Sequence, residues 1–142
     1  TRQPGDPVHV DELRRLIADR DVELLPGDAL LVRTGWLEAY QAGKVSADQW
    51  PGLHGDCADW LAECDVVLVG ADNVGVEAYP SADPDCQVPL HIELLRGNGI
   101  YFSELMNLAP LTPARQATFL FVLAPLPIVG AVGSPVAPVA VL

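Results

Sequence analysis

A histidine and a glutamate in the second half of the chain point most directly to chemistry. His91 lies in the first turn of a helix that the sequence predicts over about residues 90–96. In the strand predicted over residues 100–105, Glu104 shares a face with two apolar residues by period-two alternation. A carboxylate in the core is costly unless a cation compensates it. The pair therefore favours a divalent metal or a general acid/base pair, and the alternative is a hydrogen-bonded structural histidine beside a solvated glutamate at the end of a strand.

Three further residues are candidates for binding a substrate. Asp72 ends the apolar segment 66–72, and ligands commonly bind at the carboxyl ends of strands in open α/β sheets. His54 lies earlier in the chain, in a glycine-containing loop with Trp50 nearby, where both side chains could line a pocket. An Asx turn is the alternative for Asp72, and simple exposure is the alternative for His54. His9 is expected to be a surface residue.

Helical and strand-like segments alternate between these residues. Apolar residues at helical spacing predict helices over residues 8–20, 57–64 and 90–96. Runs of β-branched and apolar residues predict strands over residues 29–35, 66–72 and 100–105. A loop or short helix is expected over residues 36–43, and a long irregular loop over residues 73–89. The sequence thus predicts one α/β domain over residues 1–142.

Composition narrows the class of protein. The 142 residues are 50% hydrophobic and 19% charged, with a formal net charge of −11. The eight basic residues are scattered, and the excess of carboxylates repels phosphate backbones, which argues against a nucleic-acid partner. Three cysteines without a C-x-x-C pair predict reduced thiols. With no signal peptide visible, we expect a cytoplasmic protein.

The final segment, from Gln116 to Leu142, carries no charged side chain. Its length would suit a membrane span, but its four prolines and two glycines would repeatedly break a helix and leave backbone groups unsatisfied in lipid. We therefore expect two strands buried on both faces with a glycine-rich turn between them, and no membrane partner.

Five segments, taken in order, resemble the C-terminal half of the cyclase family, the metal-dependent hydrolases that include bacterial kynurenine formamidase and isatin hydrolase. They are GDALLVRTGW (27–36), PGL (51–53), VVLVGADNVGVEAYP (66–80), PLHIELLRGNGIYFSELMNL (89–108) and FLFVLAPLPIVGAVGSPVAPVAV (119–141). The resemblance runs from about Leu24 onward. It implies a swivelling β/β/α fold, a zinc or manganese ion, and hydrolysis of an amide, lactam or formamide C–N bond in a small-molecule substrate.

The resemblance also assigns residues. The family builds its metal site from a His-x-x-x-His-x-Asp segment in its N-terminal half and from a histidine and a glutamate in its C-terminal half. The latter two fall on His91 and Glu104, as metal ligands, with His91 also able to move a proton. This sequence has no His-x-x-x-His-x-Asp segment.

We therefore expect a complementary N-terminal polypeptide to complete the metal site, in a hetero- or homo-oligomer. The alternatives are a remnant with a non-hydrolytic role, or a sequence given without its other half. Two other functions stay open: a dehydration or ring-closing step on a biosynthetic intermediate, and a metal-free binding or assembly module. If a partner half is missing, the chain expressed alone should expose apolar surface and aggregate.

Overall fold

The structure is a computed structural model that describes residues 2–112 and 117–142. The chain falls into two units by its internal contacts, Thr1–Thr112 and Pro113–Leu142. The larger unit contains all of the candidate site residues named above. The smaller unit contains the whole of the charge-free segment, Gln116 to Leu142.

A three-stranded parallel sheet forms the centre of the larger unit. Its strands are β2 (Ala29–Val32), β4 (Leu68–Ala71) and β5 (Tyr101–Ser103), in the order β2-β4-β5. All four residues of β4 are buried, as expected for a run of apolar residues with a strand on each side. The three strands predicted from the sequence are confirmed, each shorter than expected. Because all three are parallel, their carboxyl ends meet at one edge of the sheet.

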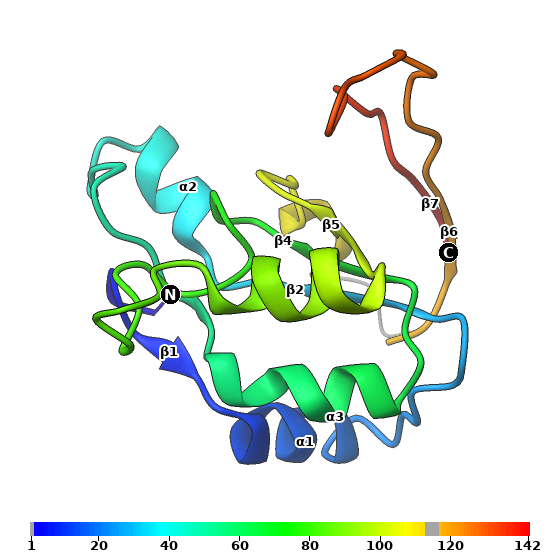
Figure 1. The fold of residues 1–142 in the computed structure, drawn as a ribbon, viewed down its shortest axis with the longest axis horizontal. Helices are drawn as coiled ribbons and strands as arrows, with labels where there is room; N and C mark the ends of the chain where they lie inside the picture. Colours follow the sequence, from blue (N-terminus) through cyan, green and yellow to red (C-terminus); the bar gives the residue numbers. More distant parts are fainter. Residues whose placement is uncertain (1, 113–116) are drawn as a thin grey trace. The chain divides into compact units, whose positions relative to one another are not determined.

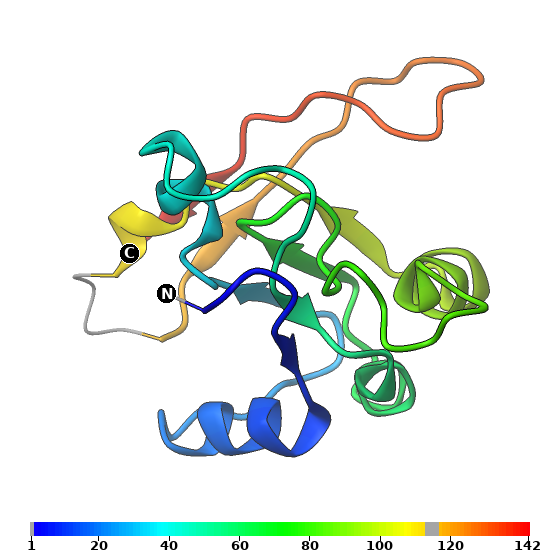
Figure 2. The same cartoon turned by 90° about the vertical axis from the view of Figure 1, so that its left-hand side faces the viewer.

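Helices precede, connect and follow these strands. They are α1 (Val10–Ala18), α2 (Trp36–Gln41), η1 (Gly55–Cys57), α3 (Ala58–Glu63), η2 (His91–Asn98) and η3 (Ala109–Leu111). Figures 1 and 2 show α1, α3 and η2 on one side of the sheet and α2 on the other. The predicted helices are confirmed, although η2 is a π-helix, a wider winding that is rare and often found at functional sites.

The core follows from the alternation of side chains along β4. Val69 and Ala71 point toward the helices and pack with buried residues of α1, α3 and η2, including Leu61 and Leu94. On the opposite face, Gly70 lies under apolar side chains: a Cβ there would be 2.6 Å from the sulfur of Met106 and 2.7 Å from Cδ2 of Leu31, so both would have to shift to admit a larger residue. Buried apolar groups thus hold β4 from both of its faces, and this fixes the positions of the residues that follow it.

A second, short parallel pair lies beside this sheet. It joins β1 (Pro7–Val8) to β3 (Gly52–Leu53), with Val8 opposite Leu53. The other side of residues 50–53 is bonded to the loop that follows β4, through bridges from Trp50 to Tyr79 and from Leu53 to Glu77. The predicted irregular loop is therefore held against the body of the unit by backbone hydrogen bonds.

The smaller unit is an antiparallel hairpin of β6 (Leu120–Val122) and β7 (Val139–Val141). The two predicted strands are present, but the prediction that both faces are buried is wrong for this chain: Leu120 is 62% exposed and Val139 is 53% exposed. A two-stranded hairpin has no second layer to cover its apolar faces. Within the described residues, no helix has the length and apolarity needed to cross a membrane.

Candidate functional site

A histidine lies between two carboxylates where η2 begins and β5 ends. Nδ1 of His91 is 2.5 Å from Oε1 of Glu77, and Nε2 of His91 is 3.5 Å from Oε1 of Glu104. The edge of the ring meets Phe102, with ring centroids 5.0 Å apart and planes at 82°. The structure thus brings His91 and Glu104 together, as the sequence indicated, and adds a second carboxylate that the sequence analysis did not identify.

The added carboxylate, Glu77, has only 3% of its side chain exposed. Besides the His91 ring it accepts hydrogen bonds from the backbone N–H of Leu90 at 2.8 Å and of His91 at 3.3 Å. The N–H groups at the start of a helix have no partner within the helix, so a carboxylate is well placed there. Glu77 therefore caps η2 and orients the His91 ring at the same time.

The backbone that carries Glu77 is tightly constrained. Val76 has a positive φ of 64°, unusual for a β-branched residue, and the Glu77 N–H donates to the Gly75 carbonyl at 2.6 Å to close a three-residue turn. A Cβ at Gly52 would lie 2.4 Å from the Val76 carbonyl oxygen, so glycine is required there. The Asn73 side chain accepts from the Val76 N–H at 2.7 Å and donates to its carbonyl at 3.1 Å. Strain of this kind persists only where the surroundings enforce it, commonly at functional sites.

The second carboxylate, Glu104, lies just past the end of β5 at Ser103, and 38% of its side chain is exposed. The prediction that Glu104 lies in the core is therefore wrong, because the strand ends before the alternation reaches it. Leu105 has a positive φ of 53°, and its N–H donates to the Asn73 carbonyl at 2.8 Å. A constrained residue thus flanks each carboxylate: Val76 precedes Glu77, and Leu105 follows Glu104.

The two carboxylates change the acidity of the imidazole. The hydrogen bond to Glu104, followed by that to Glu77, raises the pKa of His91 to about 9, although partial burial works in the opposite direction. In the metal-free protein at neutral pH, the ring therefore carries a proton on both nitrogens, one directed toward each carboxylate.

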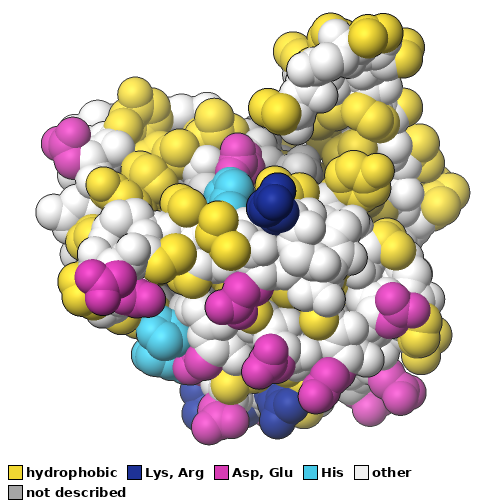
Figure 3. Space-filling model, in the orientation of Figure 1, with side chains coloured by type: hydrophobic (Ala, Val, Ile, Leu, Met, Phe, Trp, Pro, Cys, Tyr) yellow, Lys and Arg dark blue, Asp and Glu magenta, His cyan; other side chains and the backbone are white. Residues whose placement is uncertain are grey.

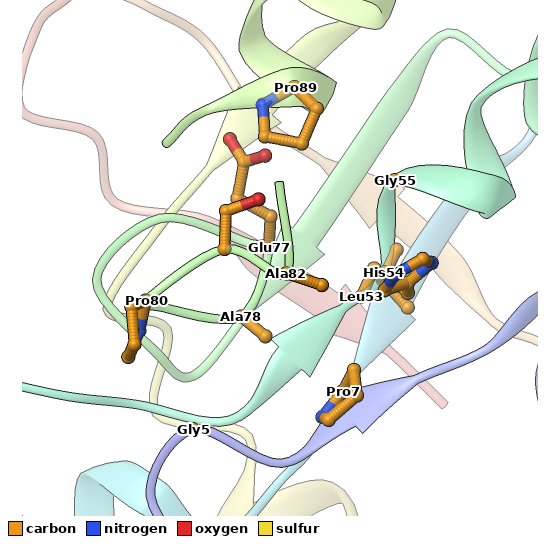
Figure 4. A pocket seen from close by; sticks show the side chains of 11 residues that line it. Gly5, Pro7, Leu53, His54, Gly55, Glu77, Ala78, Pro80, Ala82 and Pro89 are labelled. Carbon is orange, nitrogen blue, oxygen red and sulfur yellow. The ribbon is translucent and has the colours of Figure 1, made fainter. Parts of the chain in front are cut away.

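A pocket of about 130 Å³ opens next to Glu77. Its lining includes His54 and Leu53 from β3 and the turn after it, Pro7 from β1, and Pro89 just before η2. Figure 4 shows Glu77 and Pro89 on one side of the pocket and His54 on the other. Of the residues predicted to bind substrate, His54 is the one that lines this pocket.

The other two predicted substrate-binding residues have structural contacts instead. Asp72 is 1% exposed, and its carboxylate accepts hydrogen bonds from the Thr34 N–H and hydroxyl, each at 2.8 Å, and from the Gly35 N–H at 2.7 Å. Internal donors thus occupy it, and it does not reach the pocket. Trp50 donates its indole N–H to the Glu77 carbonyl at 2.9 Å and so supports the turn rather than lining the pocket.

Within the described residues, a second group of metal-ligand types consists of His9, His54 and Asp56, whose ligand atoms lie within 4.8 Å of one another. Burial raises the pKa of Asp56, but hydrogen bonds from His9 and from the Val10 N–H outweigh it and hold the pKa below its ordinary value. The neighbouring Cys57 is buried, which raises its pKa to about 12 and makes it an inert thiol.

The residues around His91 fit half of a metal site. A metal-binding histidine typically gives one ring N–H to a carboxylate and its other nitrogen to the metal. Glu77 accepts from Nδ1, while Nε2 faces Glu104. This leaves one imidazole nitrogen and one exposed carboxylate as ligands, whereas a catalytic zinc site typically takes three from protein. His91 and Glu104 therefore suit a divalent metal that is completed by further ligands.

Sequence reasoning missed Glu77 although it carried a signal. It is the single charge in the segment VGVEAYP, between Val76 and Ala78. A lone carboxylate in an apolar stretch indicates a buried, paired group by the same argument that singled out Glu104. Its partner could not have been read from the sequence, because the strained turn at Val76 determines where it points.

The family model "Putative cyclase" matches residues 1–78, so it includes the segment before Leu24 and ends before His91 and Glu104. No curated protein matches the chain. The chain is also similar to the crystal structure of a novel cyclase, with 31% sequence identity and a TM-score of 0.86. The match covers 99% of this chain and 48% of the cyclase chain.

Two isatin hydrolases have the same fold. Isatin hydrolase A from Ralstonia solanacearum is 25% identical in sequence, with a TM-score of 0.80. The match covers 97% of this chain and 54% of the isatin hydrolase chain. The enzyme from Labrenzia aggregata, bound to benzyl benzoate, is also 25% identical, with a TM-score of 0.76 over 96% and 54%. The chain thus spans about half the length of these structures. These matches confirm the predicted α/β, swivelling β/β/α fold, and the chain belongs to the cyclase family.

Proposed function

We propose that this chain supplies part of the active site of a metal-dependent hydrolase that cleaves an amide, lactam or formamide C–N bond. The observation that carries the proposal is the position of His91, with Nδ1 on the buried Glu77 and Nε2 toward the exposed Glu104. Membership of a family with isatin hydrolases among its structural relatives supports a hydrolase. The small molecule would enter the pocket beside Glu77, where His54 could contact it.

His91 and Glu104 would hold the metal, zinc or manganese. When bound, the metal would lower the pKa of a water and polarise the substrate carbonyl. Glu77 keeps the His91 ring in one orientation, because it binds Nδ1 and the backbone N–H of the same residue. Where His91 is not a ligand, the proton on its Nε2 would be given to the leaving nitrogen, with Glu77 holding the ring in place through Nδ1.

A complementary polypeptide would supply the remaining ligands. Two donors from this chain are fewer than a catalytic metal needs, and the chain spans about half of the related structures. We propose a hetero- or homo-oligomer in which the second polypeptide carries them. All three cysteines are free, which is compatible with a cytoplasmic location.

The proposal is tested with the complete protein, loaded with zinc or manganese, on isatin as a lactam and on N-formylkynurenine as a formamide. Hydrolysis in labelled water should place solvent oxygen in the acid product. We expect the His91→Ala, Glu104→Gln double variant to lose at least about 100-fold in kcat/KM, the lower end of the contribution of an acid/base group. Wild-type rates in that variant would overturn the proposal.

Two other functions make different predictions. A dehydration or ring-closing enzyme would use the same His91 and Glu104 pair but leave no solvent oxygen in its product. A metal-free binding or assembly module would purify as a monomer without metal. Native mass spectrometry combined with elemental analysis separates the cases: a transition metal in the oligomer that is lost in the His91→Ala, Glu104→Gln variant supports an enzyme.

A further inference from the structure

Two imidazoles meet where β1 and β3 end, in a cluster that shares no residue with Glu77, His91 and Glu104. Val8 pairs with Leu53 in these parallel strands, so His9 and His54 leave the pair side by side. Their ring centroids lie 4.2 Å apart, with planes at 37°. The backbone register thus determines that the two rings are neighbours.

A carboxylate from η1 lies beside both rings, at their Nδ1 edges. Oδ2 of Asp56 is 2.8 Å from Nδ1 of His9 and 3.2 Å from Nδ1 of His54. Its other oxygen accepts a hydrogen bond from the backbone N–H of Val10 at 3.1 Å, which fixes the carboxylate at the start of α1. One carboxylate oxygen therefore faces two imidazole nitrogens, from the residues that directly follow β1 and β3.

We propose that His9, His54 and Asp56 form a binding site for a divalent late transition-metal ion, with Zn²⁺ as the representative. Two imidazoles and one carboxylate are the ligand set of several open zinc sites, whereas Mg²⁺ and Ca²⁺ prefer oxygen ligands alone. Tetrahedral zinc with ligands at about 2.0–2.2 Å separates its ligand atoms by roughly 3.3–3.6 Å. The present separations of 2.8 and 3.2 Å need to widen only slightly.

The site is open to an ion from solvent. The side chains of His9, His54 and Asp56 are 52%, 27% and 38% exposed, which leaves room for a water as fourth ligand. Acidic and basic side chains both lie over α1 and α3 in Figure 3, and the acidic ones are more numerous: Asp11, Glu12, Asp59 and Glu63 against Arg14 and Arg15. A net negative field of this kind favours a cation. Bound there, the ion would join the start of α1 to η1 and brace the two-residue strands β1 and β3.

The test maps zinc binding residue by residue, because each histidine reports on its own site. The complete protein is treated with diethyl pyrocarbonate, which modifies accessible imidazoles, over a series of buffered Zn²⁺ concentrations, and the modified peptides are quantified by mass spectrometry. We expect His9 and His54 to become protected at the same Zn²⁺ concentration, and Mg²⁺ to protect neither. Absence of protection, or protection of only one of the two, would overturn the proposal.

Two conservative variants separate metal binding from folding. In Asp56→Asn, the asparagine oxygen can still accept a hydrogen bond from the Val10 N–H. In His54→Asn, the new side-chain oxygen can still accept from the Asp56 N–H, as the His54 ring does at 3.2 Å. Each should weaken zinc protection at the remaining ligands by at least about tenfold, with His91 unaffected and with the same near-UV circular dichroism as wild type. Unchanged protection of His9 in both folded variants would contradict a shared site.

Discussion

At the scale of single residues, Glu77 performs two tasks with one buried carboxylate. It accepts from the backbone of Leu90 and His91 and from the His91 ring, so three donors compensate its burial. A substitution at Glu77 therefore disturbs the start of η2 and the orientation of the imidazole together. Glu104, half open to solvent, touches only the other side of the ring.

Because Glu77 and Glu104 bind opposite sides of the His91 ring, we can predict how protons bind to the ring in the metal-free protein. His91 has a pKa of about 9 against an ordinary 6.5, owing first to Glu104 and then to Glu77. Its contribution to stability should be complete below about pH 6.5 and disappear as the pH rises through about 9. In Glu104→Gln we expect the His91 midpoint, followed by NMR of the ring, to fall toward 6.5. Glu93→Gln on the same helix is the control, and an unshifted midpoint in Glu104→Gln would contradict this account.

Asp72 supports a second prediction, since its three donors are all internal. Thr34 and Gly35 donate to different oxygens of Asp72, so Asp72→Asn places an amide NH2 against the donors of one of them while its oxygen still accepts from the other. We therefore expect a loss of about 1–3 kcal/mol in the free energy of unfolding. Denaturant titration measures it, with the exposed Asp85→Asn as a control. Turnover per folded molecule should stay at the wild-type level, and a selective rise in KM would instead show that Asp72 contacts the substrate.

At the scale of elements, the site depends on how closely β3 and the loop after β4 approach each other. The Val76 carbonyl and the Glu77 backbone lie directly over Gly52, where any side chain would collide with them. The contact is between two backbones, so side-chain rotation cannot relieve it. The position of Glu77 is therefore set by a glycine distant in sequence.

We expect Gly52→Ala to displace the turn and to cost about 1–3 kcal/mol of unfolding free energy, as overpacking typically does. The His91 pKa should fall in the same variant, because Glu77 moves away from the ring. Gly133→Ala is a matched control, since a Cβ there has no atom within 4 Å. If Gly52→Ala lowered the stability but left the pKa of His91 unchanged, Gly52 would not determine the position of Glu77.

Sequence patterns predicted the elements better than the links between them. The apolar run of β4 and the proximity of His91 and Glu104 were readable, because both follow from short-range spacing. Glu77 was missed, since its contact with His91 depends on the positive φ of Val76, which valine does not signal. The prediction that Glu104 is buried was wrong because β5 ends at Ser103, one residue before Glu104. Tertiary contacts determine where a strand ends.

At the scale of the whole molecule, the hairpin of residues 117–142 presents an apolar surface without charge. Val129 and Val132 at its tip are fully exposed, and Leu126 and Ile128 are about half exposed. Contiguous apolar surface of this kind marks an interaction site or an aggregation liability. The complementary polypeptide proposed above is one partner that could cover it.

The chain expressed alone should therefore bind a hydrophobic dye such as ANS and aggregate. A Val129→Ser, Val132→Ser variant should bind less dye than wild type, while its unfolding midpoint stays the same because neither side chain is buried. Fluorescence and light scattering measure both effects. A soluble wild-type monomer that leaves the dye dark would count against a missing partner.

The loops at the carboxyl edge of the sheet are bonded to one another as well as to their strands. Asp72 ties the loop after β4 to the loop after β2, and Asn73 ties it to Leu105 after β5. Such cross-links couple the loops, so none opens without breaking bonds to the others. We therefore expect a rigid edge, at which the loops after β2, β4 and β5 open together or not at all.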